Sequence, residues 1–256
     1  MIDLHCHVLP GIDDGPATLE ESVAIARTAA VWGTRLIVAT PHVNPRFHND
    51  AATIAGLVDE LNVRLRSEGV PLEIRGGAEV ALTRVGELAD AELSRLGLGG
   101  GPWLLVEPPF VKQFARLGPI VLDLQRRGHG IVLAHPERCP IFHREPRLLE
   151  TLVDAGVVTS ITAGSLTGVF GREVRRFAEE MLRAEMVHNV ASDAHDHAHR
   201  PPSIAAELEQ AGLTRLADWL TETVPSAILA GSDIPDPPPD AQIDTPAGGR
   251  WWQRGR

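Results

Sequence analysis

A histidine or a carboxylate follows almost every apolar segment of this chain. His5 and His7 close the first apolar segment in a His-x-His pattern, which puts both imidazoles on one face of a strand because strand side chains alternate. Similar residues follow the later apolar segments: Asp13 and Asp14, His42, Glu79, Glu107, His135, Asp193 and His195. A protein interior tolerates so many ionisable groups only when they are paired or bind a metal. The pattern therefore predicts a metal site.

The candidate ligands are imidazoles and carboxylates, with no thiolate among them. That set suits manganese, iron or zinc and disfavours a structural zinc finger. With only one of Asp13 and Asp14 counted, nine candidates remain, which are too many for a single ion. We therefore expect a cluster of two or three ions in which one carboxylate bridges.

Short apolar runs alternate with helical patterns from one end of the chain to the other. We predict strands near 1–5, 35–40, 73–79, 103–107, 130–134, 157–162 and 187–192. Thr18 and Glu21 form a capping box at the start of the first helix, and 51–67 has an apolar stripe of helical period. This alternation predicts an α/β fold with a parallel sheet, closed or nearly closed into a barrel, whose carboxyl edge carries the site. An open doubly wound sheet is the alternative.

Composition limits the possible functions. The 256 residues fit one large domain, with 43% hydrophobic residues. We assign 1–231 to that domain and the proline-rich 232–256 to a flexible tail, in which Trp251 and Trp252 have no predicted contact. The net charge of −10 disfavours a nucleic-acid partner. Neither a membrane span nor a secretory signal is recognisable, so we expect a cytoplasmic protein.

The two cysteines do not predict catalysis. A thiol phosphatase of the Cys-x5-Arg type needs an arginine six residues after its nucleophile, and neither Cys6 nor Cys139 has one. Two cysteines also make no disulfide scaffold. We interpret both as small buried thiols.

Several ordered motifs carry a family resemblance. The segments MIDLHCHVLPGIDDGP, ATPH, GAEV, HPER, ITAGSLTG and SDAH, spread over residues 1–212, resemble the polymerase-and-histidinol-phosphatase (PHP) superfamily. Within it they resemble the bacterial tyrosine-protein phosphatases of the CpsB/YwqE type, which are encoded with capsule and exopolysaccharide genes. The resemblance implies a distorted seven-stranded (β/α) barrel of the PHP type with three metal ions, usually manganese.

The resemblance also implies roles for individual residues. It places His5, His7, Glu79 and Asp193 on the first metal, Glu79, Glu107 and His135 on the second, and Asp14, His42 and His195 on the third. Asp14 is preferred to Asp13 because the superfamily ligand usually precedes glycine. Arg138 would contact the phosphate. Cys139 is a departure, since the family often has tyrosine there, and this puts the preference for an aryl substrate in question.

The implied activity is hydrolysis of phosphotyrosine by a metal-activated hydroxide, acting on a phosphotyrosyl protein such as a tyrosine kinase that controls capsule synthesis. Three alternatives stay open: a phosphatase of small phosphomonoesters, an amidohydrolase-type enzyme, and a non-catalytic regulatory module of polysaccharide export that retains its metals. An amidohydrolase commonly uses a carboxylated lysine as bridge, and the only lysine here, Lys112, lies outside the donor pattern. Ser165, in a turn expected at Ala163-Gly164-Ser165 after the strand near 157–162, is a further candidate for the lining of the pocket.

Overall fold

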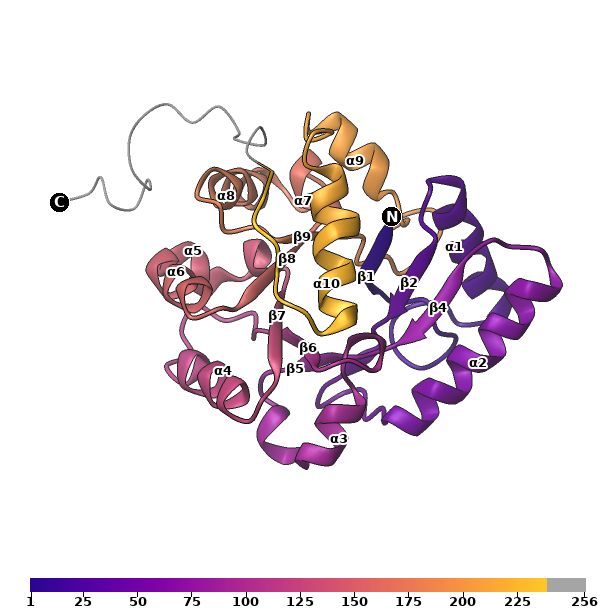
Figure 1. The fold of residues 1–256 in the computed structure, drawn as a ribbon, viewed down its shortest axis with the longest axis horizontal. Helices are drawn as coiled ribbons and strands as arrows, with labels where there is room; N and C mark the ends of the chain where they lie inside the picture. The colour runs from indigo at the N-terminus through magenta and orange to yellow at the C-terminus, as the bar shows by residue number, and fades with distance from the viewer. Residues whose placement is uncertain (239–256) are drawn as a thin grey trace.

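Nine parallel strands alternate with helices in the computed structural model, which describes residues 1–238 (Figure 1). The strands are β1 Ile2–Cys6, β2 Leu36–Ala39, β3 His42–Val43, β4 Glu73–Gly76, β5 Glu79–Ala81, β6 Trp103–Glu107, β7 Gly130–Ala134, β8 Val158–Thr162 and β9 Asn189–Ala191. They form two sheets, in the orders β1-β2-β4 and β3-β5-β6-β7-β8-β9. The predicted parallel α/β class is confirmed. No single closed sheet joins the strands within residues 1–238.

The division into two sheets comes from two breaks in the chain, near Pro41 and at Gly77. The strand expected at 35–40 ends at Ala39, and the unexpected short strand β3 begins only after Pro41, which has no backbone N–H to donate to a neighbour. The strand expected at 73–79 is interrupted at Gly77, where a Cβ would lie 2.9 Å from Val38 Cγ1. The amide of Glu79 still donates to the Pro41 carbonyl, at 3.1 Å, so the two breaks lie side by side.

The outer strands of the two sheets, β1 and β9, meet at their carboxyl ends. The amide of Asp193 donates to the His5 carbonyl at 2.8 Å, and the amide of His7 donates to the Ala194 carbonyl at 2.9 Å. These two hydrogen bonds join the first residues of the predicted site to the last.

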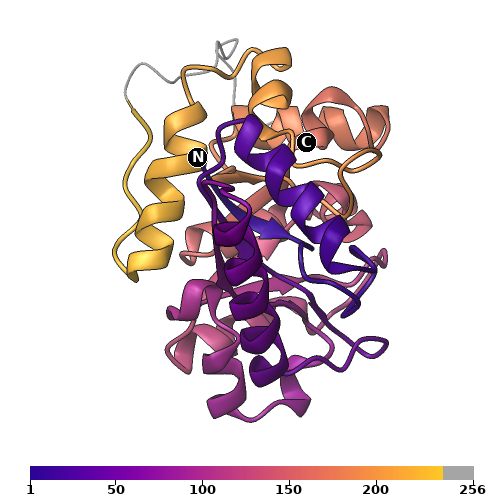
Figure 2. The same cartoon turned by 90° about the vertical axis from the view of Figure 1, so that its right-hand side faces the viewer.

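Helices surround the strands in both views (Figures 1 and 2). They are α1 Leu19–Val31, α2 Ala51–Ser67, α3 Asp90–Arg95, α4 Leu117–Arg126, α5 Pro140–Arg144, α6 Pro146–Asp154, α7 Ala163–Thr167, α8 Arg172–Arg183, α9 Ile204–Gln210 and α10 Val224–Ala230, with a π-helical turn η4 at Trp219–Thr223. The predicted capping box is confirmed, because Thr18 Oγ1 accepts from the Glu21 amide and the Glu21 carboxylate accepts from the Thr18 amide. The second helix has the predicted bounds, and its stripe of Ile54, Val58, Leu61 and Leu65 is buried.

The turn η4 and helix α10 cover the amino ends of the strands. Glu222 of η4 pairs with the amino group of Met1, at 3.5 Å, and with Arg35 just before β2. The carboxyl ends of the strands are left for the site. No helix within residues 1–238 combines the length and the apolar composition needed to cross a membrane.

The chain after α10 folds back on the domain. The Trp219 indole donates to the Pro235 carbonyl at 3.1 Å, so the start of the predicted tail packs against η4. The remaining tail, with Trp251 and Trp252, lies outside the described residues.

Candidate metal centre

The nine predicted metal ligands converge at the carboxyl ends of the strands. They form four overlapping groups whose ligand atoms lie within 4.8 Å of one another: His7, Asp14, His42 and His195; His5, His7 and Asp193; His5, Glu79 and His135; His42, Glu79 and Glu107. Residues from β1 to β9 therefore assemble one continuous cluster. Its members are separated by up to 190 positions in sequence, and the parallel topology brings them to one edge.

The first predicted metal position has a regular geometry. The Nε2 atoms of His5 and His7 lie 3.3 Å apart, and each lies 3.5 Å from Asp193 Oδ1. Glu79 Oε2 lies 3.5 Å from His5 Nε2 and 3.4 Å from His7 Nε2. Donor atoms at about 2.1 Å from a tetrahedral ion would be separated by roughly 3.4 Å. The donor atoms of His5, His7 and Asp193 have this spacing from one another, and Glu79 Oε2 has it from the two histidines.

Glu79 occupies the centre of the cluster. Its Oε1 lies 2.7 Å from His135 Nε2, while its Oε2 lies 2.9 Å from His42 Nδ1 as well as near His5 and His7. Glu79 Oε2 and His42 Nδ1 are both buried, and neither has a hydrogen bond of acceptable geometry within the described residues. Buried polar atoms without partners are costly, and a bound cation would satisfy them. The position suits a bridging carboxylate.

The other two metal positions are grouped differently from the expectation. Glu107 shares a group with His42 and Glu79, whereas His135 shares one with His5 and Glu79, so these two predicted ligands of one ion do not fall in the same group. Asp14 Oδ1 lies 3.5 Å from His42 Nε2 and 3.4 Å from His195 Nε2, as expected for the third position.

Asp13 lies behind the cluster and supports it. Its Oδ2 accepts from His7 Nδ1 at 2.7 Å and from the His42 amide at 3.1 Å, and its Oδ1 accepts from the Gly15 amide at 2.9 Å. A hydrogen bond at Nδ1 fixes the imidazole tautomer and leaves Nε2 free to bind a metal. Asp13 therefore orients His7, and Asp14 faces the cluster.

The carboxylates of the cluster differ in charge. Burial raises the pKa of Glu107 to about 8, and the neighbouring Glu79 carboxylate adds to the effect. Burial also tends to raise the pKa of Glu79 and of Asp193. The charge of His5 and further contacts with histidines outweigh burial, so the pKa of each of these two carboxyl groups lies well below its ordinary value. A cation can displace a proton held by such a carboxyl group, which couples metal binding to pH.

Backbone strain is concentrated at the same edge. Three non-glycine residues within 1–238 have a positive φ, and two of them are His135, at 32°, and Asp193, at 50°. Such a conformation costs on the order of 1–3 kcal/mol per residue and persists where the surroundings enforce it. The strain turns both side chains toward the cluster at the ends of β7 and just past β9.

Two arginines lie beside the cluster. Arg138, the predicted phosphate ligand, pairs with Asp193 Oδ2 and lies over the Phe170 ring, 4.2 Å from its centroid. Arg200 was not predicted, and it donates from Nη2 to the Asp193 carbonyl at 3.0 Å and to Asp193 Oδ2 at 2.8 Å. A turn capped by Asp196 brings Arg200 back over the site. No strand-end pattern marks a loop arginine of this kind in the sequence.

Three other residues considered in the sequence lie outside the site. Ser165 is buried in α7, a helix where we expected a turn, and it donates to the buried Glu137 carboxylate at 2.7 Å. It does not line the pocket. Cys6 and Cys139 are free and fully buried, and burial holds the pKa of each thiol well above its ordinary value. The interpretation of both as inert buried thiols is confirmed.

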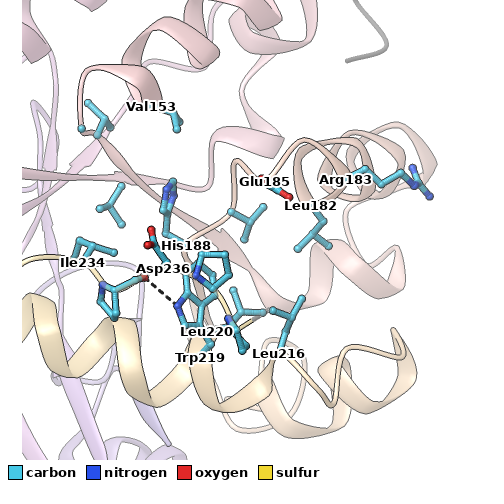
Figure 3. A pocket seen from close by; sticks show the side chains of 17 residues that line it. Val153, Leu182, Arg183, Glu185, His188, Leu216, Trp219, Leu220, Ile234 and Asp236 are labelled. Atoms are coloured by element: carbon cyan, nitrogen blue, oxygen red, sulfur yellow. Dashed lines mark hydrogen bonds between the residues drawn. The ribbon is translucent and has the colours of Figure 1, made fainter. Parts of the chain in front are cut away.

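A separate cavity of about 450 Å³ lies at the opposite, amino end of the strands (Figure 3). His188, just before β9, and Val158, at the start of β8, line it together with Trp219 and the returning segment 234–238. His188 Nδ1 accepts from the Thr159 amide at 3.2 Å. The wall is mostly apolar and includes no residue of the donor cluster.

The fold and the cluster define a parallel α/β protein with a buried cluster of histidines and carboxylates, of the kind that can hold divalent metal ions. The chain belongs to the family described as capsular polysaccharide synthesis, CpsB/CapC, which matches residues 1–214. It is 39% identical to the tyrosine-protein phosphatase YwqE of Bacillus subtilis over 77% of this chain and 78% of that one.

Solved structures agree with this assignment. A chain from the crystal structures of YwqE from Bacillus subtilis and CpsB from Streptococcus pneumoniae, described as metal-dependent tyrosine phosphatases, matches with a TM-score of 0.83 and 35% identity, over 93% of this chain and 99% of that one. The β-aspartyl dipeptidase of Fervidobacterium islandicum matches with a TM-score of 0.53 and 15% identity, over 89% of this chain and 72% of that one. The second likeness concerns the fold alone.

Proposed function

We propose that this protein is a metal-dependent protein-tyrosine phosphatase. The observation that carries the proposal is the first metal position, where the donor atoms of His5, His7 and Asp193 are spaced for a divalent cation next to two arginines. A phosphate monoester needs that combination, because its transferred group carries negative charge on several oxygens. The named activity of the relatives supports the same reaction.

In this proposal three ions, taken to be manganese, would be held by the nine donors. Glu79 would bridge, His5, His7 and Asp193 would complete the first position, and the remaining donors would hold two more ions. When bound, divalent cations acidify a water molecule and draw charge from phosphoryl oxygens. The imidazole and carboxylate donors suit manganese, iron and zinc alike.

The two arginines would bind the phosphate. Their guanidinium groups lie on the same side of Asp193, and a planar guanidinium can hold two phosphoryl oxygens at once. The Phe170 ring, 4.2 Å from the Arg138 guanidinium carbon, fixes its orientation. A phenolate leaving group has a pKa of about 10, so it needs little help from a general acid. Both cysteines are fully buried and neither has an arginine six residues on, so we propose direct attack by water rather than by a thiol.

The substrate would be a phosphotyrosyl protein, and a tyrosine kinase of capsule synthesis is the proposed partner. The family description and the phosphatase names of the relatives support this choice. We further propose that the two sheets are the halves of one distorted seven-stranded barrel. The contacts between β1 and β9 and the paired breaks at Pro41 and Gly77 support that view. Residues 1–231 would form the catalytic domain.

An amidohydrolase-type reaction is the less favoured candidate despite the shared fold. Such enzymes commonly bridge their metals with a carboxylated lysine, and Lys112 is exposed in the loop after β6. Glu79, which belongs to two of the four donor groups, would bridge instead.

The test compares one protein sample on three substrates. Metal content is measured after loading with Mn²⁺, and turnover is measured on a phosphotyrosyl peptide, the matched phosphoseryl peptide and histidinol phosphate, before and after chelation. We expect metal-dependent turnover that favours the phosphotyrosyl peptide. Preference for the small phosphomonoester would indicate a small-molecule phosphatase, and a metal-replete protein without turnover would indicate a regulatory module.

A further inference from the structure

Three of the six phenylalanines lie at the edge of the donor cluster. The Phe47 ring stacks on His42, with centroids 5.9 Å apart, and the Phe110 ring lies 5.4 Å from that of His135. The Phe170 ring lies against Arg138. The three rings come from three separate loops, after β3, after β6 and after α7. Aromatic surface therefore borders the site at several places.

Two of these loops also expose apolar surface. Phe110 is 47% exposed and its neighbour Val111 is 44% exposed, while Val169, next to Phe170, is 60% exposed. Most other large hydrophobic side chains of the described residues are buried in the core. Exposed apolar groups that gather beside a polar site commonly mark a ligand surface.

Arg138 connects the two loops. Its guanidinium carbon lies 4.2 Å from the Phe170 centroid and 5.6 Å from the Phe110 centroid. A phosphate held by Arg138 would thus have its ester group next to these rings. Cys139 cannot provide aromatic contact of its own, because its thiol is fully buried against the carbonyls of Pro108 and His135.

We propose that Phe110 and Phe170 form the two walls that hold the aryl ring of phosphotyrosine and select it over alkyl phosphates. The inference rests on the proposed phosphatase function and adds the residues that determine its specificity. It also explains how an aryl substrate can be preferred without the tyrosine that the family often has at the position of Cys139.

Nonhydrolysable ligands separate ring binding from phosphate binding. Binding of phenylphosphonate and methylphosphonate to the Mn²⁺-loaded protein is measured by calorimetry for the parent, Phe110→Ala and Phe170→Ala. Because an aromatic contact adds to the area buried, each variant should bind phenylphosphonate about tenfold more weakly. Binding of methylphosphonate, which has no ring, should change less than about twofold, as the phosphate contacts remain.

Two controls accompany the measurement. Trp32→Ala removes an aromatic side chain of similar exposure, 43%. Trp32 lies far from the cluster, because the carbonyl of the next residue, Gly33, accepts from the amino group of Met1 at the other end of β1. It should leave both affinities unchanged. The second control is a pair of leucine variants, Phe110→Leu and Phe170→Leu, which keep an apolar side chain but lose the ring face. They should recover part of the phenylphosphonate affinity. They also show whether misfolding of the alanine variants is the cause of a loss.

An equal loss for both phosphonates would overturn the proposal, because the rings would then serve only to position Arg138. Unchanged affinity for both would overturn it too. The ratio of kcat/KM for an aryl phosphate to that for an alkyl phosphate gives a second measure and should fall in parallel. Failure of the phosphatase function itself is recognised separately, since the parent protein would then not hydrolyse phosphotyrosyl peptide at all.

Discussion

Asp13 and Asp14 are adjacent in the chain, yet their carboxylates have different partners. Asp14 faces His42 and His195 across a gap suited to a cation, whereas Asp13 accepts hydrogen bonds from His7 and from two backbone amides. The family resemblance favoured Asp14 as the ligand, because it precedes glycine. It could not show that Asp13 supports a neighbouring ligand.

Substitution of the two aspartates should give different phenotypes. Asp14→Ala removes a donor and should lower metal content by up to one ion, with loss of most turnover. Asp13→Asn keeps the side-chain shape and should retain the metals with a loss of about 10- to 100-fold in affinity or rate, as is usual for groups behind a ligand. Elemental analysis and kinetics on the same preparations check this. Full metal content in Asp14→Ala would show that Asp14 is not a ligand.

Arg138 is expected to act on the phosphate without holding a metal. Removal of one preorganised donor to a transition state typically costs on the order of 10²–10³ in rate. Arg138→Ala should therefore keep its metal content and lose that much in kcat/KM, and Arg138→Lys should recover only part because lysine cannot bind two oxygens at once. Arg144→Ala, at an exposed position in α5, is the control and should behave as the parent. A near-parental rate in Arg138→Ala would assign the phosphate to the metals and Arg200.

At the scale of elements, the alternation of parallel strands with helices and the convergence of the candidate donors were predictable from the sequence, and the breaks were not. The donors could be predicted because each follows an apolar run, and parallel strands bring their carboxyl ends together. The break at Gly77 depends on contact with Val38 and Leu98, which are distant in the chain. Helix α7 was mistaken for a turn because its five residues are too few to show a helical period. Arg200 was missed for a similar reason, since its place depends on the fold of a loop.

The break near Glu79 gives a prediction with a control in the adjacent residue. A Cβ on Gly77 would lie 2.9 Å from Val38 Cγ1 and 3.3 Å from the Leu98 Cα, whereas one on Gly76 would have its nearest neighbour at 3.7 Å. Gly77→Ala should lower the free energy of unfolding by about 1–3 kcal/mol through overpacking. Gly76→Ala should change it by less than about 0.5 kcal/mol. Urea titrations of the metal-loaded variants measure both, and equal stabilities would refute the close approach.

At the scale of the whole molecule, the buried His188 links stability to pH. Burial lowers the pKa of His188 to about 4, against about 6.5 in an unfolded chain. Above pH 6.5 the imidazole is neutral in both states. As the pH falls from 6.5 to 4 the unfolded chain takes up a proton that the folded protein excludes, so stability is lost, by at most about 3 kcal/mol.

His188→Asn tests this dependence. Its amide oxygen can still accept from the Thr159 amide, as His188 Nδ1 does, but the side chain does not titrate. The free energy of unfolding of parent and variant is compared at pH 7 and pH 4.5, both after chelation. The parent should lose more stability than the variant between these two values. An identical loss would mean that His188 does not contribute.

The donor cluster draws residues from both sheets and would hold the two sheets together when metal is bound. His5 lies in β1 of the three-stranded sheet and His7 directly follows it. The donors His42, Glu79, Glu107 and His135 lie in the strands of the six-stranded sheet or directly follow them. Bound cations would pin the two halves together where few backbone hydrogen bonds do so. Binding to the folded state alone stabilises it by about 2.7 kcal/mol at a hundredfold excess over Kd.

Removal of the metals by chelation should therefore open the contact between the carboxyl ends of β1 and β9 before the rest of the protein unfolds. In hydrogen exchange measured by mass spectrometry, the amides of His7 and Asp193 should lose protection first, while those inside β6 and β7 stay protected. Uniform loss of amide protection over all strands would contradict this role of the bound metals. If the metals join the two sheets in this way, metal supply governs the lifetime of the protein as well as its rate of turnover. Without metal the junction between β1 and β9 would open and become accessible to proteases.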